Sequence, residues 1–168
     1  ALETDPSYQD VYYLIGRELK GLGRIEEARD TLLKAIELNP KDARALCELG
    51  NIFADDGEWD IAEDYYRKAI SAKPDFAYAY ERLGRILFAK GELKESENNL
   101  KKAIELSPDY QDSIYLLGCV LKKEARLEEA ETYFRRAIEL NIRDARAWNE
   151  LGEIMEEKKD YKQALNCY

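Results

Sequence analysis

"YYLIGREL" occupies residues 12–19, and four stretches of the same pattern follow it: "LCELGNIF" at 46–53, "YERLGRIL" at 80–87, "IYLLGCVL" at 114–121 and "WNELGEIM" at 148–155. Each stretch has a central glycine, and successive glycines lie 34 residues apart. Large apolar residues stand four before, one before and three after the glycine. These spacings fall on one face of an α-helix and not of a strand. The pattern therefore predicts five amphipathic helices in one repeating register.

A second helical segment follows in every unit. It carries a small residue, then an apolar residue four positions later, and in the first four units an alanine after three more. The small residues are Ala28, Ala62, Ser96, Ala130 and Ala164, the apolar ones are Leu32, Tyr66, Leu100, Phe134 and Tyr168, and the later alanines are Ala35, Ala69, Ala103 and Ala137. Small residues let two helix backbones approach closely, and the larger residues fill the space beside them. Each unit is thus predicted to be a helix pair that buries both faces only by stacking on its neighbours.

Turn and cap residues separate the predicted helices. Glycine suits a tight turn, proline cannot continue a helix, and aspartate is a favoured N-cap. The turn glycines are Gly23, Gly57 and Gly91, the helix-ending prolines are Pro40, Pro74 and Pro108, and the expected N-caps are Asp42, Asp75 and Asp109. The fourth and fifth units have Ala125 and Lys159 at the glycine position, so their turns must form without it.

This pattern resembles the tetratricopeptide repeat, a helix–turn–helix unit with the outline W-x-x-L-G-x-x-Y followed by A, F, A and P. The five quoted stretches match its first half, and "AEDYYRKAISAKP" at 62–74 and "AETYFRRAIELN" at 130–141 match its second. Ser96 in place of alanine and Ile142 in place of proline depart from it. The resemblance implies an all-α fold, a right-handed superhelical solenoid of antiparallel helix hairpins. It also implies a non-catalytic role in protein–protein interaction.

The repeat register predicts one array over residues 1–168, with complete repeats at 9–42, 43–76, 77–110 and 111–144 and a truncated fifth at 145–168. "ALETDP" at 1–6 matches "AIELNP" at 35–40, so residues 1–8 are expected to be the tail of a preceding repeat in a longer array. Terminal repeats normally carry a polar outer face. Neither end shows one, since Ile15 and Leu19 at one end and Tyr161, Leu165 and Tyr168 at the other are apolar or aromatic. We therefore expect that, at high concentration, copies of the chain associate end to end or exchange terminal helices, as a consequence of the truncation rather than as a biological function.

The charge balance limits the partners. The 168 residues include 26 Lys and Arg against 35 Asp and Glu, a net charge of −9. Binding to nucleic acid or to an anionic membrane surface needs a basic surface, so neither is expected. No apolar run reaches the roughly 18 residues that a membrane-spanning helix needs, so no membrane insertion is expected.

The sequence shows no recognisable catalytic constellation. Histidine is absent, which removes the commonest general base and a common metal ligand. No glycine-rich phosphate loop follows a strand pattern. Cys47, Cys119 and Cys167 form no Cys-x-x-Cys motif, and this odd count indicates free thiols in a reducing compartment, hence a cytoplasmic location. We predict that the chain is not an enzyme and has no cofactor and no metal site.

One stripe of each first helix changes freely between units while the stacking positions repeat. It consists of positions −6, −3, +1 and +4 relative to the glycine, and in the tetratricopeptide family it lines the inner, concave face; we call it the inner stripe. In the first four units it holds five basic and three acidic residues, so it is less acidic than the whole chain. The residues predicted to line a partner-binding groove are Tyr13, Arg17, Lys20, Arg44, Asn51, Tyr78, Arg85, Phe88, Tyr115 and Lys122.

Exposed aromatic residues beside arginine are common anchors of binding surfaces. We therefore predict that the groove binds a protein or peptide segment with acidic and apolar residues. Chaperone-tail capture, known in one subclass of the family, is not expected because the stripe lacks the paired lysines of that subclass. Three alternatives stay open: the tyrosines pack on neighbouring helices, the chain is a self-associating structural module, or it is a regulatory array attached to a catalytic domain outside these residues.

Overall fold

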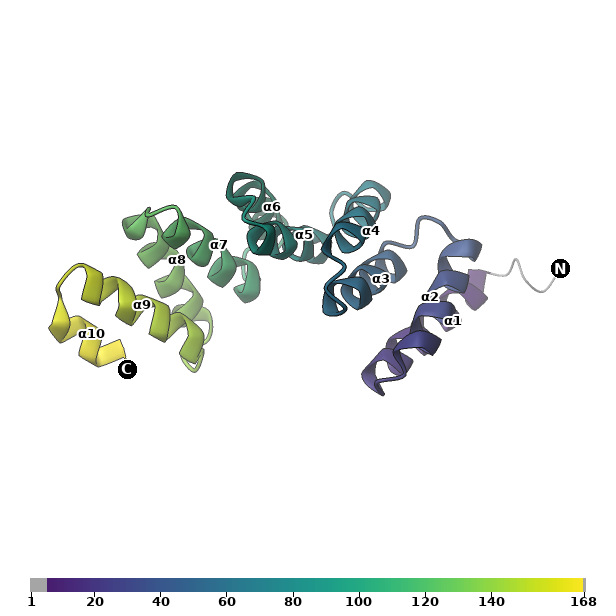
Figure 1. Cartoon of the computed structure of the whole chain (residues 1–168), viewed down its shortest axis with the longest axis horizontal. Coiled ribbons are helices and arrows are strands. Elements are labelled where there is room, and N and C mark those ends of the chain that lie inside the picture. The colour runs from purple at the N-terminus through teal and green to yellow at the C-terminus, as the bar shows by residue number, and fades with distance from the viewer. Residues whose placement is uncertain (1–5, 168) are drawn as a thin grey trace. The chain divides into compact units, whose positions relative to one another are not determined.

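The computed structural model describes residues 6–167, and every regular element in that range is a helix (Figure 1). The helices are α1 (Pro6–Gly21), α2 (Ile25–Leu38), α3 (Ala43–Asp55), α4 (Trp59–Ala72), α5 (Ala77–Lys90), α6 (Leu93–Leu106), α7 (Gln111–Lys123), α8 (Leu127–Leu140), α9 (Ala145–Glu157) and α10 (Tyr161–Cys167). The odd-numbered helices carry the repeated glycines and the even-numbered ones carry the second segments, as predicted. Within the described range, no helix combines the length and apolar character needed to cross a membrane.

Residue contacts divide the chain into two compact units, Ala1–Ile86 and Leu87–Tyr168. In the first unit α1 pairs with α2, α3 pairs with α4, and α2 packs on α3. In the second unit α7 pairs with α8, α9 pairs with α10, α6 packs on α7 and α8 packs on α9. This is the predicted stack of helix hairpins within each unit. The assignment of repeat boundaries along the whole chain stays a prediction.

Three hairpins, α1–α2, α3–α4 and α7–α8, have a close contact between a glycine of the first helix and a large side chain of the second. A Cβ atom added to Gly50 would lie 2.6 Å from Cε1 of Tyr66, and one added to Gly118 would lie 2.7 Å from Cε1 of Phe134. Both rings are buried, with exposed fractions of 1% and 0%. The rings cannot easily move aside in such a core. These glycines are therefore required for packing between helices, not for a turn.

The small residues of the second helices are buried at the same contacts. Ala28, Ala62, Ser96 and Ala130 are 0% exposed and Ala164 is 3% exposed. In the second unit Ala130 and Phe134 belong to one apolar core with residues of α7 and α9. The predicted small and apolar positions of the second helices are buried wherever the structure describes them, whereas Ile15 on the first helix is 45% exposed; Tyr168, the last of the apolar set, lies outside the described residues.

The turns inside the hairpins share one left-handed residue. Its φ angle is 75°, 81° and 82° at Gly23, Gly57 and Gly91, and it is 59° and 60° at Ala125 and Lys159. The last two turns therefore keep the geometry of the first three although they lack glycine. Because the packed helices fix where each turn begins and ends, Ala125 and Lys159 adopt a conformation that side-chain-bearing residues disfavour.

Two of the three expected N-caps are wrong. Asp42 caps α3, and its Oδ1 atom accepts hydrogen bonds from two N–H groups of the first turn at 3.0 and 3.3 Å. However, α5 begins two residues after Asp75, and the N-cap of α7 is Tyr110 rather than Asp109. Both aspartates stand one residue before the position that Asp42 holds in its repeat. Asp144 occupies that position before α9 and caps it.

The second helices end at the same point with or without proline. α8 ends two residues before Ile142, just as α2 ends two residues before Pro40. Asn39 and Asn141 follow the two helices, and each side-chain Oδ1 accepts a hydrogen bond at 3.1 Å from the N–H two residues later. Such asparagine turns stabilise the exit from the helix. The replacement of proline by Ile142 therefore leaves the helix end unchanged.

The first helix begins earlier than the repeat register suggests. α1 starts at Pro6, so residues 6–8, which the register assigns to the tail of a preceding repeat, are its first turn. Proline suits a first helical position because its missing N–H has no partner there and its φ angle is already helical. The rest of that assigned tail, residues 1–5, lies outside the described residues.

Overpacking of a hairpin contact should destabilise the fold. We expect Gly118→Leu and Ala130→Leu each to lower the free energy of unfolding by more than ~2 kcal/mol, because a buried core cannot accommodate the added atoms. Urea denaturation followed by helical circular dichroism measures this. Gly21→Leu is the control, since a Cβ there meets no atom within 4 Å. An unchanged denaturation midpoint for both core variants would contradict the packing described here.

Relief of the strained turn should stabilise the fold. We expect Ala125→Gly to raise the free energy of unfolding by about 0.5–1 kcal/mol, because glycine adopts a positive φ angle without a Cβ clash. Ala89→Gly, in the exposed part of α5, is the matched control and should lower stability by about 1 kcal/mol. Equal losses for the two variants would show that the turn at Ala125 stores no strain.

Candidate functional site

In the first unit, Arg44 of α3 is the centre of one cluster of inner-stripe side chains. Its guanidinium lies 4.6 Å from the ring centroid of Tyr13 and forms an ion pair with Asp10, both on α1. It also donates hydrogen bonds to Asp42 from Nε at 3.2 Å and from Nη2 at 3.0 Å. The hydrogen bonds from Arg44 to Asp42 and Asp10 raise the pKa of the guanidinium. The guanidinium of Arg17 also lies near the Tyr13 ring, 5.9 Å from its centroid.

Asn51 is the centre of a second cluster and is only 6% exposed. Its Oδ1 atom accepts a hydrogen bond from the hydroxyl of Tyr66 on α4 at 2.9 Å. Its Nδ2 atom donates to the hydroxyl of Tyr78 on α5 at 2.8 Å and to Glu48 at 3.3 Å. Burial raises the pKa of Tyr78. Because these three partners engage its amide, Asn51 holds three helices together and orients Tyr78.

A buried carboxylate anchors the arginines of α5. Glu81 is 0% exposed, and its Oε1 atom accepts hydrogen bonds from Nε and Nη2 of Arg85 at 2.9 and 2.6 Å. Its Oε2 atom lies 3.3 Å from Nε of Arg82, whose guanidinium stacks 4.8 Å from the ring of Tyr78. A buried charge is tolerated only when it is paired. Glu81 therefore fixes the guanidinium of Arg85, whose side chain stays 40% exposed, while its own Oε2 atom is buried without a hydrogen-bond partner.

A pocket of about 420 Å³ opens among these side chains in the first unit. Its lining consists of Lys20, Glu48, Asn51, Ala54, Asp55, Tyr66, Tyr78, Arg82, Arg85 and Ile86. Four of the predicted groove residues line it together: Lys20, Asn51, Tyr78 and Arg85. The Nζ atom of Lys20 lies 3.3 Å from Glu48 and 3.8 Å from Asp55, so the rim of the pocket carries both signs of charge.

The second unit repeats the arginine cluster. Arg146 of α9 lies 4.7 Å from the ring centroid of Tyr115 and 3.2 Å from Asp112, both on α7, and 2.9 Å from Asp144. The Tyr115 ring also lies 5.8 Å from the ring of Phe134 on α8. This tyrosine is thus partly a packing residue, as one of the alternatives from the sequence holds.

The other predicted residues of the second unit are also paired. Lys122 forms ion pairs with Glu150 at 2.8 Å and with Glu153, both on α9. Phe88 of α5 is covered by the ammonium group of Lys123, 5.0 Å from its ring. Phe88 and Lys122 therefore contribute to contacts inside this unit, and the structure does not bring them together.

Sequence reasoning missed the carboxylates that neutralise the inner stripe. Asp42, Glu48, Asp144 and Glu150 lie beside the stripe rather than on it, and each pairs with one of its cations or with Arg146. These carboxylates could have been found from the repeat itself, because they recur at fixed positions. Asp42 and Asp144 share one register position, and Glu48 and Glu150 share another. The excess of positive charge predicted for the stripe is therefore largely cancelled by these neighbours.

The cysteines are not poised for chemistry. Burial raises the pKa of Cys47 to about 12 and that of Cys119 to about 11. The thiolate is the reactive form, so both thiols are inert near neutral pH. Over residues 6–167, no group of three or more Cys, Asp or Glu side chains is arranged to hold a metal ion.

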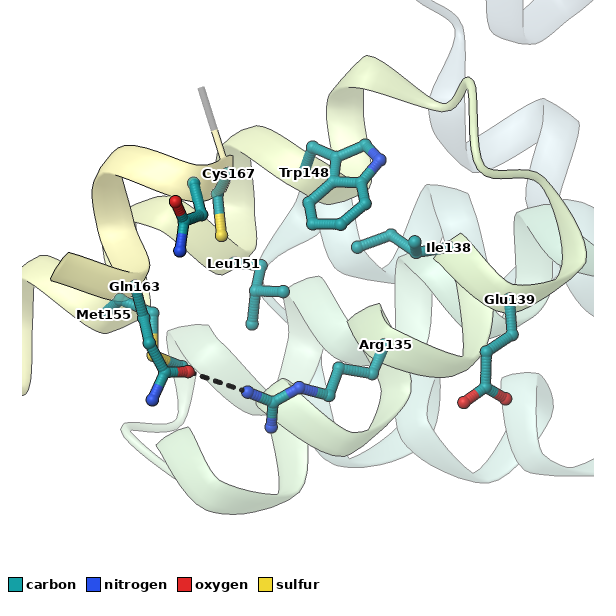
Figure 2. A pocket seen from close by; sticks show the side chains of 9 residues that line it. Arg135, Ile138, Glu139, Trp148, Leu151, Met155, Gln163 and Cys167 are labelled. Atoms are coloured by element: carbon teal, nitrogen blue, oxygen red, sulfur yellow. Dashed lines mark hydrogen bonds between the residues drawn. The ribbon is translucent and has the colours of Figure 1, made fainter. Parts of the chain in front are cut away.

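A further pocket, of about 310 Å³, lies among α8, α9 and α10 (Figure 2). Figure 2 shows Leu151 between Arg135 and Cys167, and a hydrogen bond of 3.4 Å runs from Nη2 of Arg135 to Oε1 of Gln163. None of the predicted groove residues lines this pocket.

The Asn51 cluster should contribute to stability as well as to the pocket. We expect Asn51→Leu to lower the free energy of unfolding by about 1–3 kcal/mol, because the buried hydroxyl of Tyr66 loses its acceptor. Addition of Tyr66→Phe to that variant removes the unpaired hydroxyl and should recover part of the loss. Asn149→Leu, on the exposed face of α9, is the control and should change stability by no more than about 0.5 kcal/mol. A full loss in the double variant would rule out the hydrogen bond as the cause.

Comparison with solved structures gives several similar chains. PilF of Pseudomonas aeruginosa matches with a TM-score of 0.89 at 25% identity, over 95% of this chain and 73% of that one. MamA matches with a TM-score of 0.82 at 25% identity, over 91% of this chain and 90% of that one. YrrB, described as a TPR protein with an unusual peptide-binding site, matches with a TM-score of 0.77 at 25% identity, over 93% of this chain and 80% of that one.

A search of curated proteins found no match. A family model, described as the C-terminal domain of cilia and flagella-associated protein 70 and named for its TPR repeats, matches residues 8–168. The hairpin packing, the repeated glycines and this match agree. The chain belongs to this family of tetratricopeptide-repeat domains.

Proposed function

We propose that the chain is a non-catalytic interaction module that binds a segment of a partner protein along the inner stripe of its first unit. The observation that carries this proposal is the pocket of about 420 Å³, in which Tyr78 and Arg85 are held in place by buried partners. Side chains that are ordered before binding lose little entropy when a ligand arrives. The peptide-binding site described for YrrB supports the same kind of function by similarity.

The pocket favours a ligand with acidic and apolar side chains. Arg85 and Lys20 offer positive charge, while Tyr78 and Ile86 offer apolar surface. Each cation already has a carboxylate partner, so a ligand carboxylate adds a second partner rather than neutralising a bare charge. Electrostatics should therefore contribute more to specificity than to affinity. The free cysteines are consistent with a cytoplasmic location, which we include in the proposal.

Selection from a phage library of random dodecapeptides tests this function. We expect peptides enriched in acidic and apolar residues, and we expect Arg85→Glu and Tyr78→Ala each to weaken their binding by about tenfold or more, which corresponds to about 1.4 kcal/mol. Fluorescence anisotropy of labelled synthetic peptides measures the dissociation constants.

Arg67→Glu is the matched control. Arg67 is 45% exposed and pairs with Glu63 four residues before it, as Arg85 pairs with Glu81, but it lies on α4 outside the pocket. Its reversal should leave peptide binding unchanged. Equal affinity of the selected peptides for wild type, Arg85→Glu and Tyr78→Ala would exclude the pocket as the binding site.

A further inference from the structure

The pocket of the first unit carries opposite charges on its two sides. Helices α1 and α3 contribute Lys20, Glu48 and Asp55 to its lining, and α5 contributes Arg82 and Arg85. Among the described residues that line it, the α1–α3 side thus has two carboxylates against one cation, whereas the charged groups of the α5 side are both cations. The pocket is therefore dipolar rather than simply basic.

On the α1–α3 side, one ammonium group serves two carboxylates. Nζ of Lys20 donates a hydrogen bond to Glu48 at 3.3 Å, but it lies 3.8 Å from Oδ2 of Asp55. The second distance is that of an ion pair and exceeds a hydrogen bond. The side chain of Asp55 is also 74% exposed. A cationic group of a ligand can therefore bind Asp55 while Lys20 stays on Glu48.

On the α5 side, two guanidinium groups lie within ion-pair distance of one buried carboxylate. Glu81 lies 3.3 Å from Arg82 and 2.6 Å from Arg85, and it is not part of the pocket lining. A guanidinium carries five N–H donors. Arg85 uses donors of Nε and Nη2 for Glu81. The donors of Nη1 are left for a carboxylate of a ligand.

A neutral bridge connects the two charged sides. Nδ2 of Asn51 on α3 donates to the hydroxyl of Tyr78 on α5 at 2.8 Å, and both residues line the pocket. Burial raises the pKa of Tyr78, while Arg82 acts to lower it and Glu48 acts to raise it. The hydroxyl is thus within electrostatic reach of both sides. The hydrogen bond sets the position of the acidic side relative to the basic side.

We propose that the pocket selects a partner segment that holds a basic and an acidic side chain close together, the basic one against Asp55 and the acidic one against Arg85. This inference rests on the proposed function and adds a basic residue to the acidic and apolar residues proposed there. A purely acidic segment meets Arg85 favourably but is repelled by Glu48 and Asp55. Because like charges across an interface are penalised, these two carboxylates determine specificity.

The first test repeats the dodecapeptide selection on the whole chain, as wild type and as Asp55→Lys. We expect wild-type peptides to pair Lys or Arg with Asp or Glu within a few residues. Peptides selected by Asp55→Lys should keep the acidic residue and lose the basic one, because the variant gives the α1–α3 side two cations against one carboxylate. Asp55 is the last residue of α3, where lysine suits the helix dipole, and circular dichroism should show the variant folded.

The second test is a double-mutant cycle that assigns the contact to Asp55. One peptide selected by the wild type is synthesised with its basic residue and with glutamine in that place. Fluorescence anisotropy measures the binding of both peptides to wild type and to Asp55→Asn. Glutamine should weaken binding to the wild type about threefold or more, as expected for a partly exposed ion pair. It should have little effect on Asp55→Asn, because the carboxylate is already gone.

Asp64→Lys and Asp64→Asn are the matched controls. The side chain of Asp64 is 60% exposed, and it lies on α4 outside the pocket lining. Asp64→Lys should select the same peptides as the wild type, and Asp64→Asn should leave the cost of glutamine unchanged.

The inference is overturned if peptides selected by the wild type carry no basic residue, or if glutamine costs equal affinity on wild type and Asp55→Asn. If such peptides still lose affinity for Arg85→Glu, the proposed function stands without this inference. Equal binding to wild type, Arg85→Glu and Tyr78→Ala overturns both.

Discussion

The close approach of a repeated glycine to a large side chain on the partner helix is the constraint on which the hairpins depend. At Gly50 and Gly118 the facing rings occupy the space where any other residue would place its Cβ atom. This contact sets how near the two helices lie, and the small residues at Ala62 and Ala130 complete it from the other side. The positive φ angle of Ala125 follows from the same constraint, because the packed helices fix the two ends of the turn.

The remaining first-helix surface is free to vary because the packing constraint does not reach it. In the first unit, this variable surface forms a pocket, and buried residues hydrogen-bond to two of the side chains that line it. Asn51 is bonded to Tyr66 and Tyr78, and Glu81 is bonded to Arg85. Buried polar groups of this kind are stable only when they are satisfied, and they then fix the geometry of the residues they contact. Tyr78 and Arg85 of the pocket are thus each hydrogen-bonded to a buried residue.

Charge pairing has two roles in this chain. Ion pairs such as Arg29–Asp56 connect one hairpin to the next, whereas Arg44 and Arg146 connect first helices along the inner stripe. An exposed ion pair adds little stability, but it specifies which surfaces can meet, since mismatched charges are penalised.

The helices, the pairing within the described hairpins and the buried positions of the second helices follow from the sequence, because local periodicity and residue size at fixed spacing specify them. Periodicity also identified the inner stripe, and four of its predicted members do line one pocket. It did not show that Asn51 is buried, or that Asp42, Glu48, Asp144 and Glu150 cancel the charge of the stripe. Those outcomes depend on distances between side chains from different helices, and only the tertiary structure brings them within hydrogen-bonding range. The caps at Asp75 and Asp109 are wrong for a local reason, since each aspartate stands one residue before the register position of Asp42 and so does not hold the N-cap position of its helix.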